Sequence, residues 1–262
     1  MQPTTLGPNM TGTSLAPASL AAMTRATSEL TPFDEIDTAE LESQKLDFIG
    51  EADAVGSIPV PKTMKGVAKA GLSKLKGGHP AIFLDKLGER LAYERAGTRL
   101  YEALILKFEA ARQTRDDVLP PVQFDLEDGS LRNTEGAAEA LHRIRSEELA
   151  HFQMLSKAIT TMGGDPTSQT PCADVTAMAS SGFMQVLNDP RTTLAQCLNA
   201  MLAVELADNA GWELLASLAD AAGENELAGE FLGALAQEQQ HLLIIKQWLT
   251  RLVCEDPKPA AV

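Results

Sequence analysis

Glu148-Leu149-Ala150-His151 and Glu238-Gln239-Gln240-His241 are two copies of one pattern, a glutamate followed three residues later by a histidine. Each copy lies in the middle of a long stretch whose apolar residues recur at helical spacing. Residues three apart share one face of a helix, about one turn from each other. Each copy therefore presents a carboxylate beside an imidazole, and the pattern predicts two helices that carry metal-ligating side chains.

Two further glutamates, Glu94 and Glu205, interrupt the apolar stripes of two other helical stretches near their midpoints. A buried carboxylate is costly unless it is paired, protonated or coordinated, and four at one level would repel one another. Two divalent cations would balance four such charges. The sequence therefore predicts a site for two metal ions per chain, with six ligands: Glu94, Glu148, His151, Glu205, Glu238 and His241.

Turn residues divide the chain into an all-α arrangement. Gly77-Gly78-His79-Pro80 precedes the first long helix, Gly163-Gly164 ends the second, and Asn188-Asp189-Pro190 begins the third. A short helix is predicted at about 174–187, within the long crossover between the second and third long helices. The long helices are expected at about 81–112, 134–162, 190–222 and 225–253, with a loop over 114–132. One long crossover between the second and third helices is typical of one class of four-helix bundle.

Three segments are expected along the chain. Residues 1–80 are rich in Pro, Thr, Ser and Ala and are predicted to form a largely irregular N-terminal extension. Residues 81–255 form the bundle, and residues 256–262 form a tail.

Composition excludes several classes of function. The net charge of −14 argues against nucleic-acid binding, which needs a basic surface. No stretch is long and apolar enough to span a membrane, and the N-terminus lacks the features of a secretory signal. The three cysteines are odd in number and have no C-x-x-C spacing, which argues against a disulfide framework and favours the cytoplasm.

Residues 81–253 resemble the ferritin-like superfamily of di-iron and di-manganese carboxylate proteins, especially its rubrerythrin and bacterioferritin branch. Besides the six ligands, the likeness includes Tyr101, seven residues after Glu94, and Trp212, seven residues after Glu205. A rubredoxin-like four-cysteine module is absent from the sequence. The resemblance implies that Glu94 and Glu205 are terminal ligands, that Glu148 and Glu238 bridge the metals, and that each histidine binds one metal.

The resemblance also implies roles for residues behind the ligands. Glu147 and Gln237 would each accept a hydrogen bond from the histidine of the opposite helix, although Gln237 departs from a carboxylate. Tyr101 could hydrogen-bond a terminal carboxylate or donate one electron, while Tyr101 and Trp212 could equally fill the core. Asp208 is either an extra ligand or a polar residue hydrogen-bonded within the bundle. No catalytic group beyond the metal ligands is predicted.

Carboxylate and imidazole ligands without thiolate suit iron, with manganese as the alternative. The expected function is an oxidoreductase that reacts with O2 or H2O2, either oxidising Fe(II) or acting as a peroxidase. Three alternatives remain open: a dimanganese catalase-like or substrate-oxidising enzyme, an iron-storage subunit, and a structural bundle without activity. The electron donor is unidentified from the sequence, and a homodimer or higher homo-oligomer is expected.

Overall fold

A computed structural model of the chain describes residues 6–31, 37–60, 80–114, 117–124 and 133–255. Regular structure in these residues is helical, apart from one antiparallel pair of three-residue strands. The predicted all-α class is therefore confirmed. The chain divides into two compact units, Thr4–Ala54 and a larger one that comprises Val55–Val262.

The smaller unit contains a 3-10 turn η1 (Thr13–Leu15) and the helices α1 (Pro17–Leu30) and α2 (Ala39–Glu51). None of these elements buries a residue. Helices α1 and α2 lie within the segment that was expected to be largely irregular. Both are rich in the good helix formers Ala, Leu and Glu, and Pro17 occupies a first-turn position that favours helix formation. The other parts of the predicted extension and tail, residues 61–79 and 256–262, lie outside the described residues.

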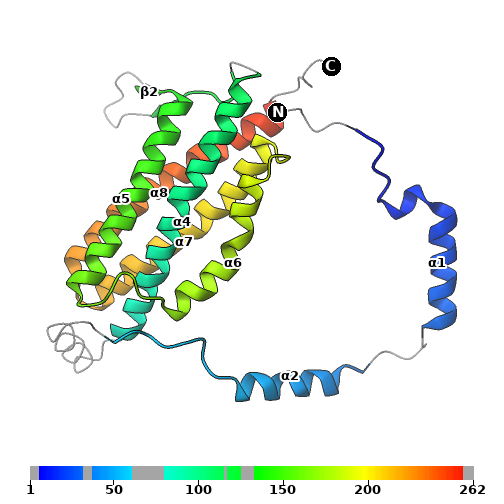
Figure 1. Cartoon of the computed structure of the whole chain (residues 1–262), viewed down its shortest axis with the longest axis horizontal. Helices are drawn as coiled ribbons and strands as arrows, with labels where there is room; N and C mark the ends of the chain where they lie inside the picture. Colours follow the sequence, from blue (N-terminus) through cyan, green and yellow to red (C-terminus); the bar gives the residue numbers. More distant parts are fainter. Residues whose placement is uncertain (1–5, 32–36, 61–79, 115–116, 125–132, 256–262) are drawn as a thin grey trace. The chain divides into compact units, whose positions relative to one another are not determined.

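The larger unit contains the predicted helices (Figure 1). They are α4 (Pro80–Arg112), α5 (Ala137–Thr161), α6 (Pro171–Asn188), α7 (Leu194–Ala221) and α8 (Asn225–Thr250), which continues into a π-helical turn, η2 (Arg251–Glu255). The short helix expected in the crossover is α6. Strands β1 (Val122–Phe124) and β2 (Asn133–Glu135) pair between α4 and α5, with Val122 opposite Glu135.

Two helix starts differ from the prediction. Residues 134–136 precede α5 because Asn133–Glu135 pairs with β1 instead of joining the helix. Helix α7 begins at Leu194, not near Pro190, because Thr193 forms a capping box with Gln196. The Thr193 hydroxyl accepts from the Gln196 amide at 3.2 Å, and the Gln196 side chain accepts from the Thr193 amide at 2.8 Å.

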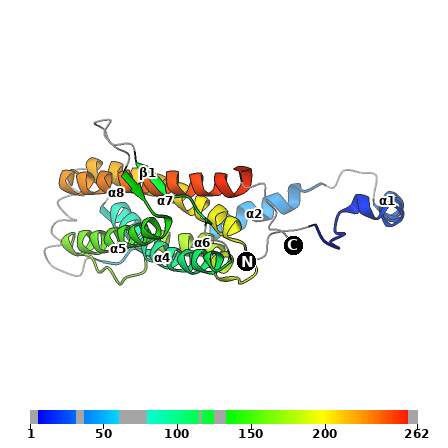
Figure 2. The same cartoon turned by 90° about the horizontal axis from the view of Figure 1, so that it is seen from above.

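The long helices pack as two pairs, α4 with α5 and α7 with α8. Figure 2 shows the pairs as two layers. Helix α4 also packs on α7, and α6 lies against α4 and α7, whereas α5 and α8 contact each other only sparsely. None of the helices in the described part of the chain is both long and apolar enough to cross a membrane.

The core of the larger unit consists of two apolar clusters, and every long helix contributes to both. The first cluster includes Leu104, Ile144, Leu198 and Ile245, and the second includes Leu87, Leu155, Leu215 and Phe231. Along α4 and α8 the chain runs from the second cluster to the first, and along α5 and α7 it runs the opposite way. At the point of passage each helix carries buried polar residues: Glu94, Glu148, His151, Glu205, Asp208, Glu238 and His241.

Two leucines of α4 give a test of this packing. Leu104 is fully buried in the first cluster, whereas Leu106, two residues later, is 71% exposed. Leu104→Ala should lower the free energy of unfolding by about 2–5 kcal/mol, because it removes buried methyl groups and leaves a cavity. Leu106→Ala should change it by less than about 0.5 kcal/mol. Urea unfolding of both variants measures the difference, and equal effects would contradict the packing described.

Candidate metal centre

The six predicted ligands lie together in the interior of the larger unit. Glu94 comes from α4, Glu205 from α7, and α5 and α8 each contribute one Glu-x-x-His pair. Each of the six predicted ligands is at most 1% exposed. Helical spacing explains this placement, because each ligand occupies the apolar stripe that turns its helix toward the core.

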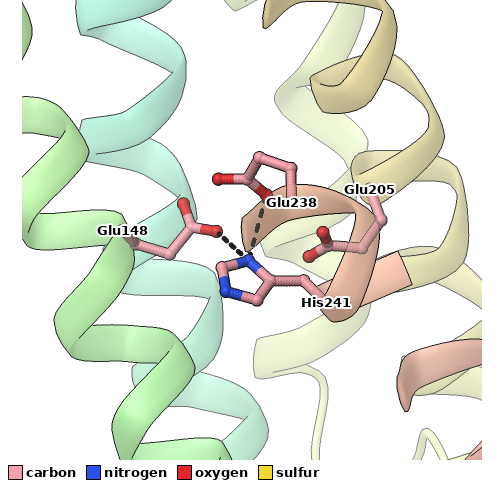
Figure 3. Close-up of side chains that lie close together, drawn as sticks. All are labelled: Glu148, Glu205, Glu238 and His241. Atoms are coloured by element: carbon pink, nitrogen blue, oxygen red, sulfur yellow. Dashed lines mark hydrogen bonds and ion pairs between the residues drawn. The ribbon is translucent and has the colours of Figure 1, made fainter. Parts of the chain in front are cut away.

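His241 faces the carboxylates with one ring nitrogen and points away with the other (Figure 3). Its Nδ1 lies 3.0 Å from Glu238 Oε2 and 3.5 Å from Glu148 Oε1. Its Nε2 lies 2.7 Å from Glu147 Oε2. Because a carboxylate accepts, Nε2 is the donor in this contact, and Nδ1 is the nitrogen directed at the cluster.

His151 repeats this arrangement from the opposite helix. Its Nδ1 lies 2.7 Å from Glu238 Oε1 and 3.6 Å from Glu94 Oε2. Its Nε2 donates to Gln237 Oε1 over 2.8 Å. Glu147 and Gln237 thus each contact the histidine of the other Glu-x-x-His helix, as the resemblance implies.

Three groups of side chains in the described residues have ligand atoms that lie within 4.8 Å of one another and could hold a metal ion. The groups are Glu148, Glu205, Glu238 and His241; Glu94, His151 and Glu238; and Glu94, Glu148, Asp208 and Glu238. Glu238 belongs to all three groups, and Glu94 and Glu148 each belong to two. Glu238 is therefore the carboxylate that all three groups share, and Glu148 links the group of Glu205 and His241 to the group of Glu94 and Asp208.

Several atoms of the cluster are buried without a hydrogen-bond partner. They are both oxygens of Glu94, Glu148 Oε2, Glu205 Oε2, Glu238 Oε1, Asp208 Oδ1 and His151 Nδ1. His151 Nδ1 and Glu238 Oε1 lie 2.7 Å apart and still are not aligned for a hydrogen bond. Buried polar atoms without partners are rare and costly, so these converging lone pairs fit metal coordination.

The pKa values show how much the buried charges disturb one another. Burial and the neighbouring Glu238 raise the pKa of Glu205 to about 8 and that of Glu148 well above its usual value. Burial alone would also raise the pKa of Glu238, but the close contacts with the imidazoles of His151 and His241 outweigh it and lower this pKa to about 2. Burial opposes the charging of His151, yet Glu238 and Glu94 raise its pKa to about 10. Without a metal ion, protons must supply the compensating charge.

Arg90 and Asp208 form a buried ion pair at the edge of the cluster. Arg90 Nη2 lies 2.6 Å from Asp208 Oδ1 and 3.3 Å from Glu94 Oε1. Asp208 was predicted as an extra ligand or a hydrogen-bonded residue. It is paired with the Arg90 guanidinium, and it also belongs to one of the three groups that could hold a metal ion. The sequence analysis missed Arg90. The available signal was its position four residues before Glu94, on the same helix face.

Tyr101 and Trp212 both contact the cluster. The Tyr101 hydroxyl donates to Glu205 Oε1, which gives the predicted hydrogen bond to a terminal carboxylate. The Trp212 ring lies 5.3 Å from the His151 ring, and its Nε1 is buried without a partner. Asn209, also missed, donates to the backbone carbonyls of Glu205 at 2.9 Å and Glu238 at 3.0 Å. It joins α7 to α8 at the level of the ligands.

Two helical glycines provide space for charged groups of the site. A Cβ at Gly97 would lie 2.0 Å from Glu148 Oε2, and a Cβ at Gly211 would lie 1.8 Å from Arg90 Nη1. Glycine costs about 1 kcal/mol relative to alanine inside a helix, which makes each of them a candidate for a close contact. Sequence inspection missed both.

Comparisons of the chain with protein-family models, with curated proteins and with solved structures found no match. The contacts within the chain are therefore the basis on which its chemistry can be inferred.

Gly97→Ala should disturb the centre more than the fold. The new methyl group must displace the Glu148 carboxylate. The affinity for metal should therefore fall about tenfold or more, which is the usual effect of disturbing the groups around a metal site. Gly233→Ala on α8 is the matched control, because its Cβ would meet nothing within 4 Å. Metal-binding titration and thermal unfolding of both variants measure the two effects. Unchanged metal affinity in Gly97→Ala would contradict the close contact.

The metal-free protein should lose stability as the pH rises from about 5 to about 9. Glu205, which faces Glu238, His241, Tyr101 and Glu94, has its pKa raised from 4.5 to about 8. His151, which faces Glu238 and Glu94, has its pKa raised from 6.5 to about 10. Each contributes stability that is complete below the lower value and is lost as the pH passes the higher one.

Urea unfolding of metal-free protein at several pH values measures this decline, and Glu205→Gln should reduce its slope. Glu238 does not oppose the decline, because its lowered pKa of about 2 makes its contribution constant above pH 4.5. A free energy of unfolding that stays constant or rises between pH 5 and 9 would show that the carboxylates are not buried as described.

Proposed function

We propose that this chain is a dinuclear metal protein with a four-helix bundle of the ferritin-like type, and that its centre reacts with O2 or peroxide. One observation carries the proposal. Two Glu-x-x-His pairs face each other from α5 and α8, with both Nδ1 atoms directed at the shared carboxylates and both Nε2 atoms hydrogen-bonded to an acceptor behind them. Metal-binding imidazoles in proteins have this arrangement, in which the second nitrogen donates and fixes the tautomer.

The grouping of the side chains supports an assignment of ligands to two positions. Glu94 and His151 form one group with Glu238, Glu205 and His241 belong to another, and Glu238 presents Oε1 to His151 and Oε2 to His241. Glu148 and Glu238 would be the bridging carboxylates, and Glu94 and Glu205 the terminal ones. This is the ligand arrangement of di-iron and di-manganese carboxylate bundles.

Charge supports the presence of two cations. The four glutamates carry up to four negative charges in a region with almost no exposure to water. Arg90 and Asp208 form a pair whose charges cancel, so they leave this excess in place. Two divalent ions would neutralise it, whereas the metal-free protein needs protons on carboxylates and imidazoles.

The donor set fits both iron and manganese, and we propose iron as the metal. Oxygen and imidazole nitrogen are ligands that both metals accept, and Cys197 is buried in the first apolar cluster, apart from the ligand groups. Two bound iron ions would supply the redox chemistry, in which Fe(II) is oxidised and O2 or peroxide is reduced.

The protein residues would hold and shield the centre. Glu147 and Gln237 orient the imidazoles, and the Tyr101 hydroxyl holds Glu205 Oε1 so that Oε2 remains available as a ligand atom. The two apolar clusters lie on either side and exclude water, which strengthens electrostatic interactions inside.

The proposal predicts about two metal ions per chain in protein prepared with iron or manganese. His151→Ala and His241→Ala should each lower the metal content by at least one ion and abolish most of the oxidation of Fe(II) by O2 or peroxide. His142→Ala is the control, because His142 lies on α5 with its side chain exposed. Metal analysis and absorbance assays of ferric iron provide the measurements. Full metal content in both ligand variants would refute the proposed centre.

A further inference from the structure

We propose that the two metal positions have unequal affinities, with the position of Glu205 and His241 binding a divalent cation more tightly than that of Glu94 and His151. This inference rests on the proposed function, because it concerns the same centre. It follows from the residues that surround the ligands, which differ between the two halves of the site.

Corresponding positions on the paired helices can be read from their spacing. Glu94 corresponds to Glu205. Arg90 lies four residues before Glu94, and Met201 lies four residues before Glu205. Glu147 directly precedes Glu148 on α5, and Gln237 directly precedes Glu238 on α8. The ligands are thus duplicated, but these flanking residues are not.

Arg90 places a positive charge on the Glu94 side. Its guanidinium lies 3.3 Å from Glu94 Oε1, and it is 5% exposed, so little water screens it. The corresponding Met201 is buried and uncharged. Glu205 is held instead by the neutral hydroxyl of Tyr101. A cation bound by Glu94 therefore competes with the guanidinium for the carboxylate, whereas a cation bound by Glu205 competes only with a neutral hydroxyl.

The acceptors behind the histidines act in the same direction. His241 donates to the carboxylate of Glu147, and His151 donates to the neutral amide of Gln237. Arg143 contacts Glu147 at 2.8 Å, but it also pairs with Glu135 at 3.0 Å, so its single positive charge is shared between two carboxylates. An anionic acceptor makes an imidazole a stronger ligand, which favours the metal position of His241.

Asp208 does not restore equality. It pairs with Arg90 Nη2 at 2.6 Å, but the same nitrogen also lies 3.3 Å from Glu94 Oε1, so the guanidinium still competes with a cation for that carboxylate. Its equivalent, three residues after Glu94, is Gly97. The inequality predicts stepwise loading, in which the first ion is retained at the Glu205 position while the ion at the Glu94 position exchanges more readily.

Calorimetric titration of metal-free protein with Mn²⁺ in the absence of oxygen tests the inequality. Wild-type protein should take up two ions in steps that differ about tenfold or more in affinity. Gln237→Glu should strengthen the weaker step about tenfold and leave the tighter step unchanged. Gln239→Glu adds the same charge to the same helix on an exposed side chain and should change neither step.

Two further variants locate the steps independently. Glu147→Gln should weaken the tighter step, and Arg90→Met should strengthen the weaker one. Circular dichroism shows whether each variant is folded, and Gln237→Glu still tests the proposal if Arg90→Met fails to fold. Two steps of equal affinity, or an effect of Gln237→Glu on the tighter step, would overturn the inequality and leave the dinuclear centre standing. A protein that binds no Mn²⁺ at the buried ligands would overturn both.

Discussion

The burial of four glutamates at one level of the helical domain is the constraint on which the remaining structure depends. Every long helix passes from one apolar cluster to the other at its ligand, so the polar layer has no direct access to bulk water. Carboxylates in such a layer need compensating charge. The two imidazoles and the protons implied by the raised pKa values of Glu148 and Glu205 supply it in the metal-free chain. Ligand atoms of this layer lie within 4.8 Å of one another, close enough to hold a metal ion.

The ligands could be predicted from the sequence because their signal is local. A glutamate and a histidine three residues apart share a helix face whatever the helix packs against. The placement of Glu94 and Glu205 followed from the apolar stripes around them. The crosswise contacts of Glu147 and Gln237 depend on which helices face each other, and they were anticipated from the family resemblance rather than from spacing.

The residues that were missed act through space that only the folded chain defines. Gly97 and Gly211 matter because a side chain from another helix occupies the volume beside each of them. From the sequence alone Arg90 resembles a surface charge, and only the folded chain shows its ion pair with Asp208 of α7. The start of α7 was misplaced because two signals compete, Pro190 at a helix start and Thr193 with Gln196 as a capping box, and hydrogen bonding favours the second. Helices α1 and α2 have adequate helix propensity but no buried face, so apolar periodicity did not reveal them.

The sparse packing between α5 and α8 has a consequence for how the domain opens. These two helices carry the Glu-x-x-His pairs, and they contact each other far less than either contacts its own hairpin partner. The polar contacts of His151 with Gln237 and of His241 with Glu147 bridge them. In contrast, Asn209 joins α7 and α8 at the same level. Local opening should therefore occur between α5 and α8, while α4 stays packed on α7, and amide hydrogen exchange along α5 would report how often this opening occurs.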